Sequence, residues 1–134
     1  MEKKLRKKCE KLHKQNQFGE IITLLEAQSK DDYEVISQLA RAYNNKGRFQ
    51  EAVSLLQSAQ EQGADDPLWY FRLGYAYDHL KQPEQALAAF EKVQELNPRD
   101  WEARLYIRQC RKKVRKQRPR TDAPIDEAVK KEEQ

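Results

Sequence analysis

Two consecutive blocks of equal length, 33–66 and 67–100, carry the same spacing of apolar and small residues. The second block reads Tyr70-x-x-Leu73-Gly74-x-x-Tyr77, followed by Ala86-x-x-x-Phe90 and Pro98. The first block reads Ile36-x-x-Leu39-Ala40-x-x-Tyr43, followed by Ala52-x-x-x-Leu56, with Ala64 in the place of the proline. A fixed period of this length predicts one supersecondary unit that is copied and stacked, because each copy buries its apolar face only against its neighbour.

Proline and glycine divide each block into two helices. Asp66-Pro67 is an N-cap followed by a first-turn proline, which predicts a helix from there to about residue 80. Gln82-Pro83 begins the next predicted helix, which Asn97-Pro98 stops after residue 96. In the first block, Lys46-Gly47-Arg48 separates predicted helices at 33–45 and 49–62, and Gly63 ends the second one. Each block is therefore predicted to be an antiparallel helix pair with a tight turn.

Small residues mark where the two helices of a pair cross. Ala40 and Gly74 allow a close approach, and we expect them to lie opposite Ala52 and Ala86. Larger apolar side chains three and four residues apart then fill the space around each crossing. These flanking residues are Leu39, Tyr43, Leu56, Leu73, Tyr77 and Phe90.

The period, the small residue at the eighth position and the alanine at the twentieth resemble the tetratricopeptide repeat over the 68 residues of the two blocks, 33–100. Pro83 and Ala64 depart from that pattern, but proline is tolerated where a helix begins. The resemblance implies an all-α fold, a right-handed α-solenoid of about three helix pairs with a C-terminal capping helix. It also implies a non-catalytic role in protein–protein interaction, as an adaptor, a scaffold or a co-chaperone-like protein.

Less regular segments flank the two blocks. A degenerate N-terminal copy is predicted at 2–32, with a polar first helix at about 2–15, since Leu5-x-x-Lys8-Cys9-x-x-Leu12, Phe18 and Ile21-x-x-x-Leu25 follow the same spacing. Terminal repeats are expected to be atypical because one face meets water. A helix at about 101–117 is predicted to cap the stack through Ala103, Ile107, Cys110 and Val114. Its Arg104, Arg108 and Arg111 occupy positions where a second helix would pack. The predicted domain is 1–118, with 119–134 as a flexible charged tail.

In tetratricopeptide-repeat proteins, the first helix of each pair lines a concave groove with its second, fifth, sixth, ninth, twelfth and thirteenth residues. Carried over, the middle repeat contributes Glu34, Ser37, Gln38, Arg41, Asn44 and Asn45. The last repeat contributes Leu68, Phe71, Arg72, Tyr75, Asp78 and His79, and the degenerate copy contributes Lys3, Arg6, Lys7, Glu10, His13 and Lys14. The residues we expect to bind a peptide are Gln38, Arg41, Asn44, Asn45, Phe71, Arg72, Tyr75 and His79.

The chemistry of these side chains favours an acidic or C-terminal peptide. Arginine forks suit carboxylates, and amides can bond an extended backbone as donor and acceptor. We expect Arg41, Asn45 and Arg72 to be the main anchors; the alternative is that all are solvated helix residues. The family's carboxylate clamp uses Lys, Asn, Asn, Lys and Arg. Arg72 and Arg6 fit that clamp, but Glu10 and Leu68 do not and Gln38 replaces an asparagine. The clamp is therefore expected to be absent.

The charge distribution leaves other partners open. The chain has a net charge of +4, and the run 111–120 is strongly basic. Such a run favours nucleic acid or an anionic membrane surface, or it is a solvated helix end. No aromatic residues are interleaved for base stacking, so nucleic acid is the less favoured partner. Self-association, an immunity-type role, and folding of the acidic segment 121–134 into the groove are further alternatives.

The sequence predicts no enzyme, no cofactor and no metal site. It contains no HExxH, GxxxxGK[ST] or GxGxxG motif, and its carboxylates are spread along helices. His13 and His79 are expected to be surface or groove residues. Cys9 and Cys110 lack CxxC spacing and are predicted to be reduced, packed thiols, with a disulfide or a metal site as the alternative. No apolar run is long enough to span a membrane, and no signal peptide is recognisable. A cytoplasmic location is the expectation.

Overall fold

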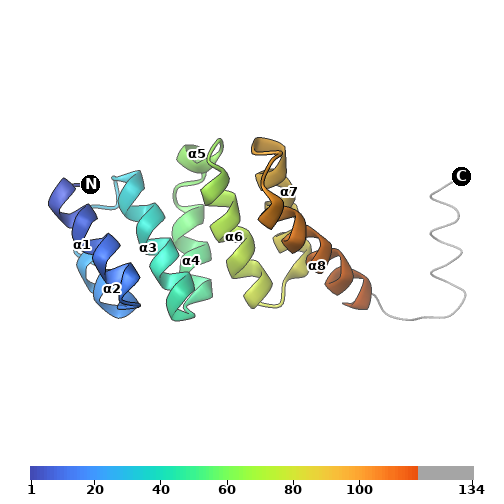
Figure 1. Cartoon of the computed structure of the whole chain (residues 1–134), viewed down its shortest axis with the longest axis horizontal. Helices are drawn as coiled ribbons and strands as arrows, with labels where there is room; N and C mark the ends of the chain where they lie inside the picture. The colour runs from blue at the N-terminus through green and yellow to red at the C-terminus, as the bar shows by residue number, and fades with distance from the viewer. Residues whose placement is uncertain (118–134) are drawn as a thin grey trace, which may run out of the picture.

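The computed structural model describes residues 1–117. The predicted tail at 119–134, its suggested contact with the groove, and the last residues of the basic run lie outside the described residues. Within 1–117 the chain forms eight helices and no strand, and the helices follow one another in a row (Figure 1). They are α1 (Lys3–Lys14), α2 (Phe18–Glu26), α3 (Tyr33–Lys46), α4 (Phe49–Gln57), α5 (Gln60–Gly63), α6 (Pro67–His79), α7 (Pro83–Leu96) and α8 (Trp101–Gln117).

Three turns with one hydrogen-bond pattern divide the helices into pairs. The first helix of each pair ends in a residue with positive φ: Asn16 at 56°, Gly47 at 84° and Lys81 at 62°. The next residue donates its backbone N–H to the carbonyl five residues earlier, at 2.8–2.9 Å in each turn. This is the Schellman arrangement that satisfies the last carbonyls of a helix. Because it also ends α1, the turn between α1 and α2 has the same hydrogen-bond pattern as the turns within the two regular blocks.

The predicted helix at 49–62 is divided into α4 and α5. The carbonyl of Leu56 would accept a bond from residue 60 in a continuous helix. Instead it accepts the Trp69 indole Nε1–H at 2.9 Å and the Ala59 N–H at 3.0 Å. Ser58 Oγ also bonds back to the Leu55 carbonyl at 2.5 Å. The chain therefore bends after α4, and the short α5 brings Gly63 against the Trp69 ring.

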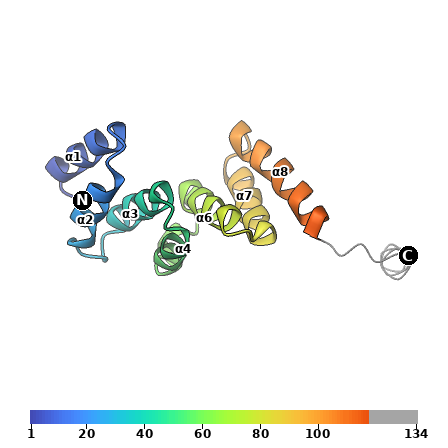
Figure 2. The same cartoon turned by 90° about the horizontal axis from the view of Figure 1, so that it is seen from below.

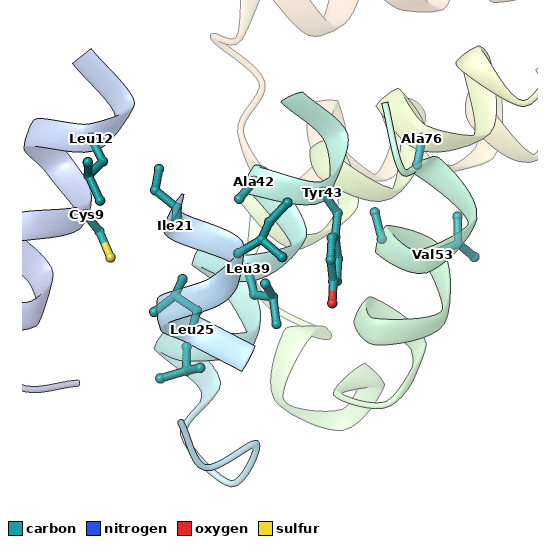
Figure 3. Close-up of a cluster of buried hydrophobic side chains, with 12 residues drawn as sticks. Cys9, Leu12, Ile21, Leu25, Leu39, Ala42, Tyr43, Val53 and Ala76 are labelled. Atoms are coloured by element: carbon teal, nitrogen blue, oxygen red, sulfur yellow. The ribbon is translucent and has the colours of Figure 1, made fainter. Parts of the chain in front are cut away.

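An apolar core joins the first two helix pairs to α6, the first helix of the third pair. Its largest cluster runs from α1 through α2 and α3 to α4 and α6, and Figure 3 shows its side chains. Cys9, Ile21, Leu25, Leu39 and Ala76 are at most 2% exposed. Since α1 contributes buried Cys9 and Leu12 to this cluster, the N-terminal copy packs as part of the stack. Removing apolar surface from water in this way is the main favourable term for such a fold.

At each helix crossing, a small residue of the first helix lies against a bulky side chain of the second. A Cβ atom on Gly74 would lie 2.9 Å from two atoms of the Phe90 ring. Ala40 likewise clusters with Leu56 and Trp69 rather than with Ala52. The small residue therefore faces the bulky residue four positions after the alanine expected opposite it. The reason is geometric, because residues i and i+4 share one helix face and the larger side chain fills the gap.

The last helix closes the described part of the stack (Figure 2). Asp100 Oδ1 accepts the Ala103 N–H at 2.9 Å at the start of α8. Ile107 and Cys110 then pack on Phe90, as the predicted stripe requires. Both cysteines are buried free thiols, and burial raises the pKa of Cys110 to about 11. None of the helices between residues 1 and 117 combines the length and the apolar character needed to span a membrane.

Candidate peptide-binding groove

Two aspartates fix the helices that line the groove. Asp32 and Asp66 are the N-caps of α3 and α6, and each accepts the backbone N–H two residues later at 2.9–3.0 Å. Asp66 also accepts a hydrogen bond from the Tyr33 hydroxyl at 2.6 Å. Burial of the hydroxyl, together with that bond, raises the pKa of Tyr33. The starts of α3 and α6 are thus tied to each other, which sets the register of their exposed faces.

A pocket lies between these faces. Its volume is about 400 Å³. Six of the eight residues predicted to bind a peptide line it, together with the predicted groove residue Leu68. The lining is Arg41, Asn44, Asn45, Leu68, Phe71, Arg72 and Tyr75. The other two predicted residues, Gln38 and His79, do not line this pocket.

Arg72 is partly committed to the protein itself. Its Nη1 donates to the backbone carbonyl of Ser37 at 2.7 Å and also to the Ser37 hydroxyl. Burial, together with the nearby positive charge of Arg41, lowers the pKa of Arg72 to about 10. Arg41 is exposed and has no ion pair with another residue in 1–117. Two cations therefore face one pocket, and Arg41 is the freer of them.

Two side chains in this region have polar atoms without partners. Asn44 is 6% exposed; its Nδ2 donates to the Arg72 carbonyl at 3.0 Å, but its Oδ1 has no partner within the described residues. Both ring nitrogens of His13 are also buried without a bond in that part of the chain. Burial, together with the positive charges of Arg41 and Arg72, lowers the pKa of His13 to about 4. Near neutral pH, His13 therefore adds no positive charge and keeps one acceptor nitrogen.

Aromatic rings flank the pocket on its α6 side. Phe71 packs edge-on against Phe90 and Tyr106, with centroids 5.5 and 5.4 Å away. Tyr75 lies 4.3 Å from the His79 ring, which stacks on Phe49 at 4.6 Å. His79 Nδ1 also lies 3.0 Å from the Tyr75 carbonyl. These contacts hold Tyr75 and Phe71 in place as an apolar wall, and they show that His79 supports the wall.

Other predicted groove residues bond to one another. Arg6 makes a two-pronged contact with Glu34, at 2.5 and 2.8 Å, and this lowers the pKa of the Glu34 carboxyl. The N-terminal ammonium pairs with Asp32 at 2.5 Å. Four predicted residues of α1, namely Lys3, Lys7, Glu10 and Lys14, are exposed and line no part of the pocket. No residue of α1 lines the pocket, although His13 lies close enough to Arg41 and Arg72 for their charges to lower its pKa.

Sequence reasoning missed two residues near the groove. Lys113 of α8 reaches Asp78 of α6 at 2.6 Å, across the end of the groove. Repeat positions counted on from Trp101 place Lys113 at a thirteenth position, so that count would have found it. Phe49 lies in α4, the second helix of its pair, so a count of groove positions on the first helices could not find it. Among residues 1–117, no group of three or more His, Cys, Asp or Glu side chains is placed to hold a metal ion.

Family comparison agrees with this geometry. Two tetratricopeptide-repeat models match the chain, one over residues 12–73 and the other over 67–100. With the repeated turns and the stacked helix pairs, these matches establish that the chain belongs to the tetratricopeptide-repeat family. Its fold is that of a protein-interaction module. A search of curated proteins finds no match to the sequence.

Several solved structures are similar. The first TPR domain of Spaghetti (RPAP3), bound to the HSP90 peptide SRMEEVD, is 26% identical with a TM-score of 0.75, covering 82% of this chain and 90% of that one. The NMR structure of the first TPR domain of human RPAP3 is 26% identical with a TM-score of 0.76, covering 84% and 91%. The P58(IPK) TPR domain, 15% identical, has a TM-score of 0.79 over 87% of this chain and 34% of that one, which shows the shared fold.

Proposed function

We propose that this protein is a non-catalytic adaptor or scaffold, in the manner of a co-chaperone, whose groove binds an acidic peptide, preferably at its free C-terminus. The observation that carries the proposal is the pocket that combines Arg41 and Arg72 with Asn44, Asn45 and an aromatic wall. Two guanidinium groups without a carboxylate partner in residues 1–117 favour an anionic ligand.

The polar atoms define how such a peptide would be held. Arg41 is free to make a two-pronged bond to a carboxylate, and Arg72 keeps donors besides the Nη1 that bonds Ser37. Asn45 is exposed and can bond the peptide backbone. The unpartnered Oδ1 of Asn44 can accept a peptide N–H, which would remove the cost of a buried acceptor without a donor.

The similarity to Spaghetti (RPAP3) supports this class of ligand, because the peptide in that structure has three acidic residues in its last four positions. The means of binding would differ. Arg6, which fitted the family's clamp, is held by Glu34, and neither Glu10 nor Leu68 offers a cation. Arg41 would therefore supply charge that the clamp takes from elsewhere in the groove.

Calorimetry with the peptide SRMEEVD and with its C-terminal amide tests the proposal. The substitution pair Arg41→Gln/Asn45→Ala changes only exposed residues, so the fold should persist. We expect it to weaken binding by about tenfold or more, since bonds to charged groups contribute about 1.5–3 kcal/mol. Lys46→Gln is the control, because it removes one charge from an exposed neighbour outside the pocket. Equal affinity of all three proteins, or no binding by any, would refute the proposal.

A further inference from the structure

The outer side of α8 carries arginines at regular intervals. Arg104, Arg108, Arg111 and Arg115 follow an i, i+4, i+7, i+11 spacing, so they form one stripe along the helix. With Gln94 of α7 and Ile107, they surround a hollow of about 360 Å³. At about 1.5 Å of rise per residue, the stripe is roughly 16 Å long. The stripe is long enough to contact three turns of another helix.

These arginines are not neutralised within residues 1–117. None of the ion pairs in that part of the chain includes them. Arg104 alone has a side-chain hydrogen bond there, from its Nη2 to the Pro98 carbonyl at 2.9 Å. Like charges three and four residues apart on a helix repel one another. The negative charges of an anionic partner would attract these arginines and offset the repulsion among them.

Apolar surface adjoins the stripe. Trp101 is 69% exposed and Leu105 is 44% exposed, and Leu68 is the only other large apolar side chain so exposed in the described chain. Trp101 and Leu105 are four residues apart and lie next to Arg104 and Arg108 on the helix surface. Tryptophan and arginine are enriched at protein interfaces. Leucine offers no charge or stacking to a nucleic acid, so the combination favours a protein partner.

The position of the stripe indicates the shape of that partner. In each earlier pair, the second helix packs on the first, as α7 does on α6. The α8 arginines occupy the positions at which such a second helix would pack. At about 100° per residue, Lys113, which reaches the groove residue Asp78, lies on the opposite side of α8 from Arg104, Arg108 and Arg111. The stripe is therefore separate from the peptide-binding groove.

We propose that the α8 face, meaning the four arginines with Trp101 and Leu105, binds an acidic amphipathic helix of a partner protein. Carboxylates spaced i, i+4, i+7 on the partner pair with the arginines. Apolar residues on the adjoining side of the partner helix cover Trp101 and Leu105. The partner occupies the place that a further second helix would take in the stack.

Fluorescence anisotropy with the full chain tests this. The probe is a labelled helical peptide with Glu at i, i+4, i+7 and i+11 and Leu beside them. A peptide of equal composition, with Glu scattered around the helix, is the matched probe. We expect Arg108→Gln/Arg111→Gln/Arg115→Gln to weaken binding of the first peptide by about tenfold. The variant Lys4→Gln/Lys8→Gln/Lys11→Gln removes the same charge from exposed positions of α1 and should change it by less than about twofold.

Two further variants and a duplex DNA probe decide between explanations. Trp101→Ala/Leu105→Ala should weaken the peptide but leave any binding to duplex DNA unchanged. Arg41→Gln should leave helix binding unchanged, because the groove is a different surface. Equal loss in both triple variants, equal binding of the two peptides, or dependence on Arg41 would overturn the proposal. Arginine-dependent binding of duplex DNA without binding of the peptide would also overturn it and assign the face to nucleic acid.

Discussion

Gly74 is the position where one added methyl group tests the packing of the repeats. The Cβ of Gly74→Ala would lie 2.9 Å from Cε1 and Cζ of Phe90 and 3.1 Å from Cδ1. Carbon atoms prefer about 3.5–4.0 Å, so the ring or the helix must move by roughly 0.6–1 Å. Phe90 has no free space, because it is fully buried and stacks on Tyr106 with centroids 4.7 Å apart.

The expected cost follows from two opposing effects. Overpacking of a core costs about 1–3 kcal/mol, whereas replacing glycine by alanine inside a helix gains roughly 0.8–1 kcal/mol. The net loss of unfolding free energy for Gly74→Ala is therefore about 0–2 kcal/mol, and Gly74→Leu should lose about 1–3 kcal/mol. For a chain of this size the alanine variant should melt at a temperature up to roughly 8 °C lower. Urea unfolding followed by circular dichroism gives the free energy directly.

Gly19→Ala is the matched control, since nothing lies within 4 Å of its added Cβ in helix α2. It should leave stability unchanged or raise it by up to about 1 kcal/mol. Combining Gly74→Ala with Phe90→Leu should cost less than the sum of the two single changes, because the smaller side chain relieves the clash. Strict additivity, or equal stabilisation by both alanine substitutions, would refute the proposed contact.

Three other predictions follow from the turns, the helix break and the buried histidine. Because residues 81 and 47 both have positive φ, Lys81→Gly should raise the unfolding free energy by about 0.5–1 kcal/mol and Gly47→Ala should lower it by about 1–2 kcal/mol. Urea unfolding measures both changes, and changes in the same direction would contradict the prediction. Trp69→Phe should cost about 1 kcal/mol by removing the bond to the Leu56 carbonyl, measured in the same way, and a neutral result would contradict that role for the indole. An NMR titration should give His13 a pKa well below 6.5. Because the unfolded chain then binds more protons than the folded one, the unfolding free energy should fall as the pH drops from about 6.5 to 4, and His13→Gln should make it depend less on pH.

Much of the fold could be predicted because the repeat is local in sequence. The helix pairs follow from turn residues and apolar spacing, and the observed bounds of α3, α6, α7 and α8 differ from the predicted ones by at most about one residue. The division of α4 from α5 could not be predicted in this way. It depends on Trp69 Nε1 reaching a carbonyl 13 residues earlier in the chain.

The candidate site also has features that follow from the local sequence and features that depend on contacts between distant residues. Repeat positions placed Arg41, Asn44, Asn45 and Tyr75 around one pocket, because a fixed period on a helix determines which residues share a face. The period does not determine which of them bond to the protein itself. Arg72 bonds Ser37 and Arg6 bonds Glu34, at separations of 35 and 28 residues. Because of these bonds between repeats, Arg72 has fewer free donors than Arg41, which is the main anchor in the proposed function.

Mapping a bound peptide onto the chain tests the central claim most directly. When the ¹⁵N-labelled chain is titrated with SRMEEVD, we expect the largest amide shifts at Arg41, Asn44, Asn45, Arg72 and Tyr75, around the groove pocket. The His13 ring should shift too, with a higher pKa, because a carboxylate near it offsets the charges of Arg41 and Arg72. Shifts confined to α8 or to the second helices of the pairs, with His13 unchanged, would contradict a peptide-binding groove.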